Sequence, residues 1–296
     1  MAARFGRVVP AMITPFAADG ALNVDMSVHL AKWLVEQGCE GLVITGTTGE
    51  GPTITDEEDW ELWRAVTEAV TVPVVIGSTT NDTAHSVAQT KMAEQCGADG
   101  ILAVTPYYNK PSQAGIYQHF EAVAEATSLP VVLYDIPPRS HRKIETNTML
   151  ALANNVSNIV AVKDAAGDPA ETARVIAEAP AGFEVYSGDD KLTLPLMAVG
   201  AVGVITVCGH WTAPEFVKMF DAFEAGDIEG ARAANTAMLD SYAFESTDDA
   251  PNPVPTKAML RAIGLDVGEP RLPMGPTPSG LEDEARIIYD KLVSQR

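Results

Sequence analysis

Residues 130–165 read PVVLYDIPPRSHRKIETNTMLALANNVSNIVAVKDA. The stretch begins and ends with a short apolar run, at 130–136 and at 159–165, and a longer segment with helical spacing lies between them. Runs that are almost continuously apolar indicate parallel strands that are buried on both faces. The stretch therefore predicts one strand–helix–strand unit.

The same alternation recurs along the whole chain. Candidate strands lie at 8–14, 41–45, 72–78, 100–105, 130–136, 159–165, 184–189 and 201–208. Segments such as 25–37 and 83–96 place apolar residues at i, i+3, i+4 and i+7, as a helix with one buried face requires. Eight such units predict an α/β fold, namely a closed (β/α)8 TIM barrel. An open doubly wound sheet is the alternative.

The chain is longer than eight units require. We expect a (β/α)8 barrel core at 1–212, and C-terminal helices at 213–296 that close the barrel and form a helical appendage. Helical patterns in this second part lie at 214–225, 228–242, 254–263 and 281–294, and they are interrupted by the proline-rich stretches 250–255 and 269–278.

Composition and charge exclude several classes of partner. The chain has 296 residues, 46% of them hydrophobic and 20% charged, so a large folded core is expected. The formal net charge of −20 argues against nucleic acid and anionic membranes as partners. Cys39, Cys96 and Cys208 form no C-x-x-C pair, and no apolar window approaches the roughly 20 residues of a membrane span. These features favour a cytoplasmic location.

Metal chemistry has little support in the sequence. The five histidines show neither H-x-H nor H-E-x-x-H spacing, so no metal is expected. The acidic residues gather where we expect outer helices and tails, and they predict a solvated acidic coat. They include those at 56–59, 248–249 and 282–284, together with Glu61 and Glu245.

Active sites of (β/α)8 barrels lie at the carboxyl ends of the strands, where the following loops converge. Polar clusters follow the predicted strands at 45–51, 105–109, 134–139, 163–164 and 187–190, and at Thr206. We therefore expect the functional side chains at this mouth of the barrel.

Lys163 lies inside the apolar run 159–165. Strand alternation places Lys163 on one face with Ile159, Ala161 and Ala165, and small residues suit the crowded interior of a barrel. An ammonium group is costly to bury without a partner, so such a lysine loses its proton readily. The neutral amine can then attack a carbonyl carbon and form a Schiff base. A lysine that is ion-paired with a carboxylate is the alternative.

Two further elements are expected beside Lys163. Tyr134 lies near the end of the preceding strand, where its hydroxyl group could transfer protons, although a tyrosine at the edge of the core is the alternative. The loop at 46–51, GTTGEG, can turn backbone N–H groups and hydroxyl groups toward a bound anion, and a plain structural turn is the alternative.

Six segments carry a resemblance to a known family. The segments GTTGEGPT, TPYYNKP, YDIPPRS, VKDAAGD, SGDD and GVITV occur in that order, and NPVPTK and EPRLPM follow them. Together they resemble the pyruvate-dependent class I aldolases of the dihydrodipicolinate synthase/N-acetylneuraminate lyase group. The resemblance covers nearly the whole chain.

This resemblance implies roles for individual residues. Lys163 would form the Schiff base with pyruvate, and Tyr134 would transfer protons in a relay with Thr47 and Tyr108. In the family that second tyrosine reaches in from a neighbouring subunit, so a dimer at least, and a homotetramer built as a dimer of dimers, is implied. No metal and no organic cofactor is implied.

Four further positions match residues of the family that bind the substrates. Thr48 and Ile205 would hold pyruvate, and the carbonyl group of Gly188 would line the site. Arg139 would bind the carboxylate of L-aspartate 4-semialdehyde through two hydrogen bonds. Its presence and that of Thr47 favour the synthase members, which make 4-hydroxy-tetrahydrodipicolinate for diaminopimelate and lysine biosynthesis.

Other functions remain open at this stage. One alternative is another aldolase of the group, acting as an N-acetylneuraminate lyase or on a 2-keto-3-deoxy sugar acid. A barrel that binds a keto acid without catalysis is another, although binding alone requires no imine-forming amine.

Some positions depart from the commonest family pattern. Asp135 stands in place of asparagine and Asp164 in place of glutamate. At the positions that match the lysine feedback pocket of some members, His85 stands where a carboxylate would bind the effector's ammonium group, so we expect weak or absent lysine inhibition. The pocket positions are Gly51, Pro52, Asp56, Asp59, Asn81, His85 and Tyr107.

Overall fold

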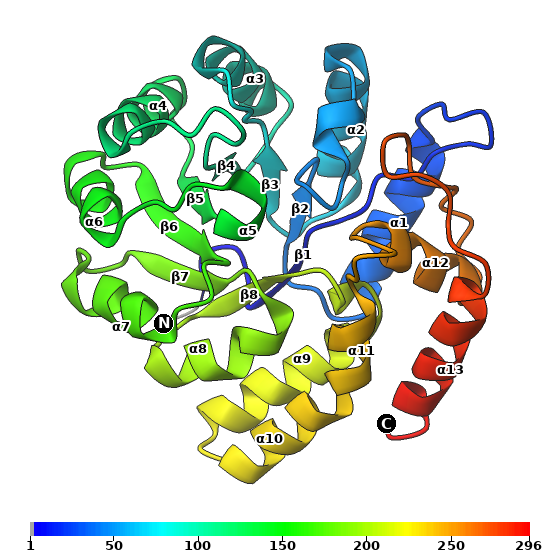
Figure 1. Ribbon diagram of the computed structural model, residues 1–296. Helices are drawn as coiled ribbons and strands as arrows, with labels where there is room; N and C mark the ends of the chain where they lie inside the picture. The colour runs from blue at the N-terminus through cyan, green and yellow to red at the C-terminus, as the bar shows by residue number, and fades with distance from the viewer. Residues whose placement is uncertain (1–2) are drawn as a thin grey trace.

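The barrel is seen in a computed structural model, which describes residues 3–296. Its eight parallel strands are β1 (Val8–Pro10), β2 (Leu42–Ile44), β3 (Val74–Gly77), β4 (Gly100–Val104), β5 (Val131–Asp135), β6 (Ile159–Asp164), β7 (Glu184–Ser187) and β8 (Gly203–Thr206). Neighbours in the chain pair from β2 to β8, and β8 pairs with β1. A parallel bridge between Ala11 and Val43 joins β1 to β2. The predicted (β/α)8 barrel is confirmed, and the open sheet is wrong (Figure 1).

Helices surround the strands (Figure 1). The outer ring consists of α1 (Val24–Glu36), α2 (Asp56–Ala69), α3 (Thr83–Gln95), α4 (Gln113–Glu125), α6 (Thr146–Asn155), α7 (Pro169–Glu178), α8 (Thr193–Val199) and α9 (Gly209–Glu224). Short helical turns follow β2, β5 and β7 at the mouth, namely η1 (Gly51–Thr53), α5 (Pro137–Ser140) and η2 (Asp190–Leu192). These turns belong to the loops in which the sequence predicted functional residues.

The core has two layers, because alternate strand residues point to opposite sides of the barrel wall. The inner layer includes Phe5, Val9, Val43, Val75, Leu102, Val132, Tyr134, Ala161, Tyr186 and Ile205. The outer layer packs the other faces of the strands, such as Val8, Leu42 and Ile44, against the apolar sides of the helices. Side chains therefore fill the interior of the barrel, and a substrate can bind only at its mouth.

The expected alternation on β6 is wrong at the beginning of the strand. Val131 pairs with Ile159, but the next residue, Val132, pairs with Ala161, so the register shifts at Val160. As a result Ile159 packs in the outer layer and Val160 packs against the inner one. An extra residue in one strand changes the facing of the residues on either side of it. Beyond the shift, Ala161 belongs to the inner layer as expected.

The C-terminal segment forms four helices after α9: α10 (Ile228–Ala237), α11 (Leu239–Phe244), α12 (Val254–Ala262) and α13 (Leu281–Val293). They lie along one side of the barrel beside α1 and α9 (Figure 1). The single helix expected at 228–242 is two helices, which are separated at Met238. Residues 212 and 213 both lie inside α9, which packs beside β1 and closes the ring. Among the helices of residues 3–296, none combines the length and the apolar character that crossing a bilayer demands.

Candidate active site

Lys163 and Tyr134 are register partners on the neighbouring strands β6 and β5. The Lys163 Nζ atom lies 4.2 Å from the centroid of the Tyr134 ring, and both residues are 4% exposed. Within residues 3–296 no carboxylate forms a direct ion pair with Lys163, although the carboxyl groups of Asp190 and Glu245 act on it from farther away. The strands thus hold a buried amine against a phenol ring.

Burial lowers the pKa of Lys163 to about 8, the charge of Asp190 opposes this shift, and the charge of Arg139 adds to it. A fraction on the order of a tenth of the amine is therefore neutral at pH 7. Burial raises the pKa of Tyr134, while the charge of Arg139 and a hydrogen bond with Thr47 act against that rise. The site therefore combines a usable nucleophile with a phenol that keeps its proton.

Gly188 leaves room for the lysine. A Cβ atom at position 188 would lie 2.9 Å from Lys163 Cγ and 3.0 Å from the Cβ atom of Ala165. The Gly188 N–H donates to the carbonyl oxygen of Asp164 at 2.7 Å, which fixes this close approach. Only glycine fits here without moving the lysine side chain.

The loop after β2 carries the two predicted threonines. Thr47 is half-buried and lines a cavity of about 510 Å³ that Tyr134 also lines. Thr48 is 3% exposed, and its Oγ atom accepts a hydrogen bond from Asn252 Nδ2 at 2.9 Å. That contact uses Thr48 as the acceptor, so its hydroxyl proton can still be donated to an anion.

Arg139 and Tyr108 line the same cavity. Arg139 lies in α5 and is exposed, and no ion pair within residues 3–296 engages its guanidinium group. Tyr108 has a φ of 70° and is 85% exposed. The remaining predicted residue, Ile205, is 2% exposed on β8. Lys163, Tyr134, Thr47 and Gly188 are thus brought together in one chain, whereas Tyr108 is directed to solvent.

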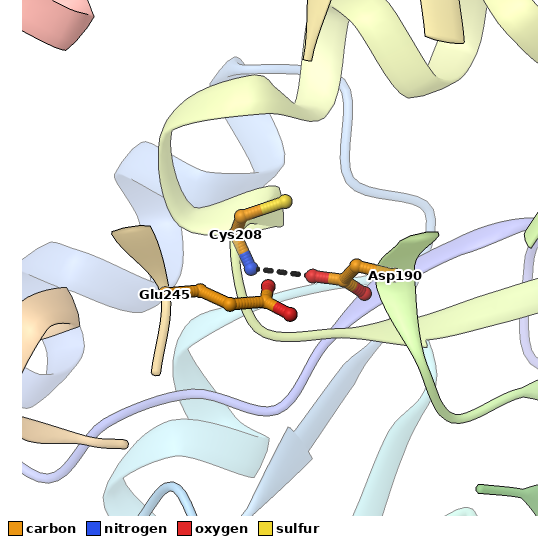
Figure 2. A group of neighbouring side chains, drawn as sticks. All are labelled: Asp190, Cys208 and Glu245. Atoms are coloured by element: carbon orange, nitrogen blue, oxygen red, sulfur yellow. Dashed lines mark hydrogen bonds between the residues drawn. The ribbon is translucent and has the colours of Figure 1, made fainter. Parts of the chain in front are cut away.

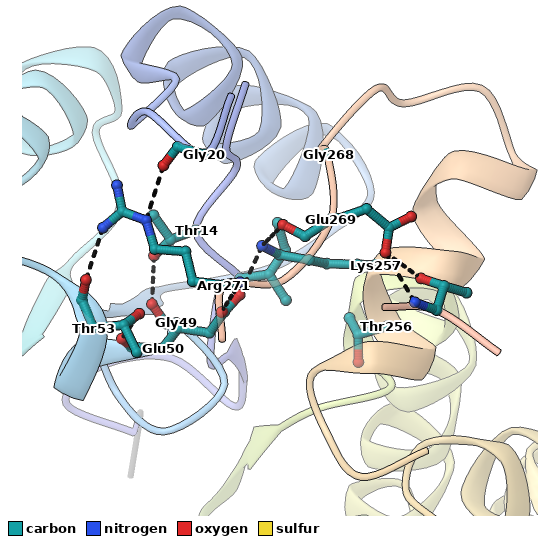
Figure 3. A network of polar contacts seen from close by, with 12 residues as sticks. Thr14, Gly20, Gly49, Glu50, Thr53, Thr256, Lys257, Gly268, Glu269 and Arg271 are labelled. Atoms are coloured by element: carbon teal, nitrogen blue, oxygen red, sulfur yellow. Dashed lines mark hydrogen bonds and ion pairs between the residues drawn. The ribbon is translucent and has the colours of Figure 1, made fainter. Parts of the chain in front are cut away.

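A buried ion pair fastens the loop after β2 to the C-terminal segment (Figure 3). Lys257 Nζ lies 2.7 Å from Glu50 Oε1 and 4.1 Å from the centroid of the Phe16 ring. The Arg271 N–H donates to Glu50 Oε2 at 2.8 Å, and its guanidinium group donates to the carbonyl oxygen of Thr53 at 2.7 Å. The sequence analysis assigned no role to these contacts, because the residues lie about 200 positions apart and show no local pattern.

All the positions of the predicted lysine pocket except Asn81 are among the residues that line the cavity. Asp56 Oδ1 accepts a hydrogen bond from Gln89 Nε2 at 2.5 Å and lies 3.9 Å from His85 Nε2. Asp59 is 9% exposed, and burial raises its pKa to about 8, with the charges of Asp56 and Glu58 acting in the same direction. Asp59 was expected in the acidic coat, and that expectation is wrong because α2 turns this side chain inward.

Glu245 also departs from the predicted coat. Its carboxyl group, that of Asp190 and the Cys208 thiol lie together, with one ligand-type atom of each within 4.8 Å of the others (Figure 2). These three residues are the one such group found within residues 3–296. Burial raises the pKa of the Cys208 thiol well above its ordinary value, so it keeps its proton, which makes it a poor metal ligand.

Known proteins share the sequence pattern and the fold of this chain. The sequence model described as "Dihydrodipicolinate synthetase family" matches residues 4–292. A 4-hydroxy-tetrahydrodipicolinate synthase from Mycolicibacterium paratuberculosis is 49% identical over 95% of this chain and 93% of its own length. The structure of dihydrodipicolinate synthase from Bacillus anthracis matches with a TM-score of 0.92 and 41% identity, covering 100% of this chain and 99% of that one.

A second solved structure, dihydrodipicolinate synthase from Cyanidioschyzon merolae with lysine bound, has a TM-score of 0.94 and 38% identity, covering 98% of this chain and 99% of that one. The sequence match, the curated relative and both structures extend over nearly the whole chain. The chain belongs to the dihydrodipicolinate synthetase family.

Proposed function

We propose that the chain is a lyase of the pyruvate-dependent class I aldolase type, which condenses pyruvate with L-aspartate 4-semialdehyde to give 4-hydroxy-tetrahydrodipicolinate. The observation that carries this proposal is the buried Lys163 amine, which lies against Tyr134 and has no direct ion-pair partner within residues 3–296. Such an amine is a nucleophile for a ketone at neutral pH. The curated relatives named as this synthase support the choice of reaction.

In the first half of the reaction the Lys163 nitrogen attacks C2 of pyruvate, and the carbonyl oxygen leaves as water once it has gained protons. A protonated imine results, and loss of a proton from C3 gives the enamine. Tyr134 carries these protons, because it is the phenol in contact with Lys163 and it interacts with Thr47. Thr48, Gly188 and Ile205 hold the keto acid in this proposal, because these positions match the pyruvate-binding residues of the family.

In the second half C3 of the enamine attacks the aldehyde carbon of L-aspartate 4-semialdehyde. The amino group of this substrate then attacks C2, the ring closes, and Lys163 is released as the free amine. Arg139 is exposed at the rim of the cavity and has no carboxylate partner of its own in residues 3–296, so its guanidinium group can bind the substrate carboxylate. The proposed reaction belongs to the biosynthesis of diaminopimelate and lysine in the cytoplasm.

Tyr108 supports an assembly of more than one chain. A tyrosine that is 85% exposed and has a φ of 70° is costly in an isolated chain, and a partner subunit would cover it. We infer a homotetramer built as a dimer of dimers, in which Tyr108 completes the proton relay of a neighbouring chain. Light scattering of the wild type and of Tyr108→Arg tests this, since an unchanged assembly in the variant would contradict the role of Tyr108 at the interface.

Reduction with borohydride in the presence of pyruvate, followed by peptide mass spectrometry, tests the Schiff base. The pyruvate adduct is expected on Lys163 and absent from Lys163→Met, with Lys191→Met as a control that keeps the adduct. An adduct elsewhere, or none, would refute the proposal. Turnover of aspartate semialdehyde, compared with N-acetylmannosamine and sugar aldehydes, tests the second substrate.

A further inference from the structure

Asp190 and Glu245 bring two carboxyl groups together beside the ends of β7 and β8 (Figure 2). Asp190 begins η2, three residues after the end of β7, and Glu245 directly follows α11. Asp190 is 2% exposed. Because Gly188, two residues before Asp190, approaches the Lys163 side chain closely, the acid pair lies in the part of the mouth that holds the nucleophile.

The hydrogen bonds of the two acids are unequal. Asp190 Oδ2 accepts from Thr206 Oγ at 2.8 Å, from the Val207 N–H at 3.0 Å and from the Cys208 N–H at 2.7 Å. Asp190 Oδ1 and Glu245 Oε2 are both buried, and neither receives a hydrogen bond from any donor in residues 3–296. Two ionised carboxylates this close would repel each other and leave both oxygens unsatisfied.

We propose that Glu245 is a neutral carboxylic acid that donates a hydrogen bond to Asp190, so that the pair carries one negative charge. This charge lies on Asp190, and it is the counter-charge of the Lys163 ammonium group and of the protonated imine formed on Lys163. The counter-charge role rests on the Schiff-base function proposed above. Glu245 is then a positioning residue, because it acts on Lys163 through Asp190.

The assignment of the proton to Glu245 follows from the donors. Three hydrogen bonds, two of them from backbone N–H groups, stabilise the ionised form of Asp190, whereas within residues 3–296 Glu245 has no comparable set. Burial raises the pKa of Glu245 well above its ordinary value, and the adjacent Asp190 acts in the same direction. The negative charge on Asp190 in turn raises the pKa of Lys163 against the effect of burial.

The charges of the surrounding groups do not change this assignment of the proton to Glu245 and of the negative charge to Asp190. Lys191 is 65% exposed and lies 3.8 Å from Asp189, so its charge is directed to that residue and to solvent. Burial lowers the pKa of His210 to about 4, so the imidazole is neutral. The titratable groups that interact with the acid pair or with Lys163 are Tyr134, Arg139, Asp189, Lys191, Cys208, His210 and Tyr242.

A bound metal ion is the competing explanation of two facing carboxyl groups. It fits less well, because three donors already occupy Asp190 Oδ2 and because Thr212 Oγ donates to the Cys208 sulfur at 3.3 Å. A divalent cation there would also repel the cation that forms at Lys163. A shared proton satisfies both free carboxyl oxygens at no such cost.

Infrared difference spectroscopy of the full-length protein at pH 8 tests the protonated acid directly. A C=O stretch of a neutral carboxylic acid is expected in the wild type and in Asp248→Asn, a control at an exposed acid of the same segment. Glu245→Gln is expected to lose the Glu245 part of this signal, while the part that comes from Asp59, whose pKa is raised to about 8, remains. A C=O signal that is equal in the wild type and in Glu245→Gln, or one stoichiometric metal ion that this variant loses, would overturn the proposal.

The charge distribution is tested by the pH at which imine formation with pyruvate is half-maximal. Glu245→Gln keeps a donor toward Asp190, so this pH should move by less than about a third of a unit, whereas Asp190→Asn should lower it by about one unit. An equal drop in both variants would mean that Glu245 carries charge, and the proposal would fail. If Asp190→Asn does not fold, the infrared arm still decides. If no imine forms even in the wild type, the Schiff-base function fails, while the infrared band still reports on the pair.

Discussion

Lys257 Nζ lies 2.7 Å from Glu50 Oε1, and neither side chain is more than 1% exposed. Glu50 follows Thr47 and Thr48 in the loop after β2, while Lys257 belongs to α12 in the C-terminal segment. Glu50 has a φ of 57°, a conformation that is costly for a residue with a side chain and that needs contacts to hold it. The C-terminal helices therefore do more than cover the barrel, because they hold the loop that carries two residues of the proposed site.

Lys257→Met should be strongly destabilising. It leaves the Glu50 carboxylate buried without its cation, and breaking a buried pair in this way costs about 3–5 kcal/mol of unfolding free energy. Urea denaturation measures this. Lys291→Met, which breaks the exposed pair with Asp240, is the matched control and should cost about 0–1 kcal/mol. Equal effects of the two substitutions would show that the buried pair does not hold the loop.

Gly188→Ala should impair imine formation more than folding. The added methyl group would lie 2.9 Å from Lys163 Cγ, so the lysine must shift, at a cost of about 1–3 kcal/mol for the overpacked site. Single-turnover trapping of the pyruvate adduct should be slower than in the wild type. Gly115→Ala in α4 is the control, since its Cβ atom would come no nearer than 3.4 Å to any neighbour. Wild-type trapping by Gly188→Ala would contradict the close packing of the lysine.

The rate of imine formation should rise with pH and level off above about pH 8. Burial lowers the pKa of Lys163 to about 8, so the neutral amine becomes the main form there. The same shift affects stability. The unfolded chain keeps the proton on this lysine up to its ordinary pKa of 10.5, whereas the folded chain loses it above about pH 8. The free energy of unfolding should therefore increase between about pH 8 and 10.5. Below pH 8 the cost of burying the ammonium group is present in full.

Lys163→Met isolates that contribution. The variant should form no adduct and should be at least as stable as the wild type at pH 7, because the buried amine is removed. Its advantage in unfolding free energy should shrink toward pH 10.5. A variant that is less stable at pH 7 would show that the attraction between Lys163 and the charge of Asp190 outweighs the cost of burying the ammonium group.

The sequence predicted all eight strands, because runs such as 131–135 bury β-branched residues on both faces and need no distant information. It misplaced Ile159 and Val160, since the register shift depends on how β6 pairs with β5. It placed Glu245 in the acidic coat, since no local pattern distinguishes a buried acid from an exposed one. Glu245 is half-buried, and its carboxyl group lies beside that of Asp190, 55 residues earlier in the chain. Contacts between segments that are far apart in the sequence thus determine the register of β6 and the surroundings of Glu245, which local periodicity cannot predict.

L-Lysine should bind weakly or not at all at the outer part of the cavity. Asp56 Oδ1 already accepts a hydrogen bond from Gln89 at 2.5 Å, and His85, whose Nε2 atom lies 3.9 Å from Asp56, supplies no charge that would attract an ammonium group. Calorimetry of the wild type should show no binding at micromolar lysine. His85→Glu adds a carboxylate, and a new charged hydrogen bond should strengthen binding about tenfold.

His29→Glu on α1 is the matched control, because it adds the same charge outside the residues that line the cavity. Its lysine affinity should equal that of the wild type. Micromolar binding by the wild type, or equal gains in the two variants, would contradict the role given to His85. In the first case the acids of the pocket, Asp56 and Asp59, would suffice to hold the ammonium group, since both line the cavity.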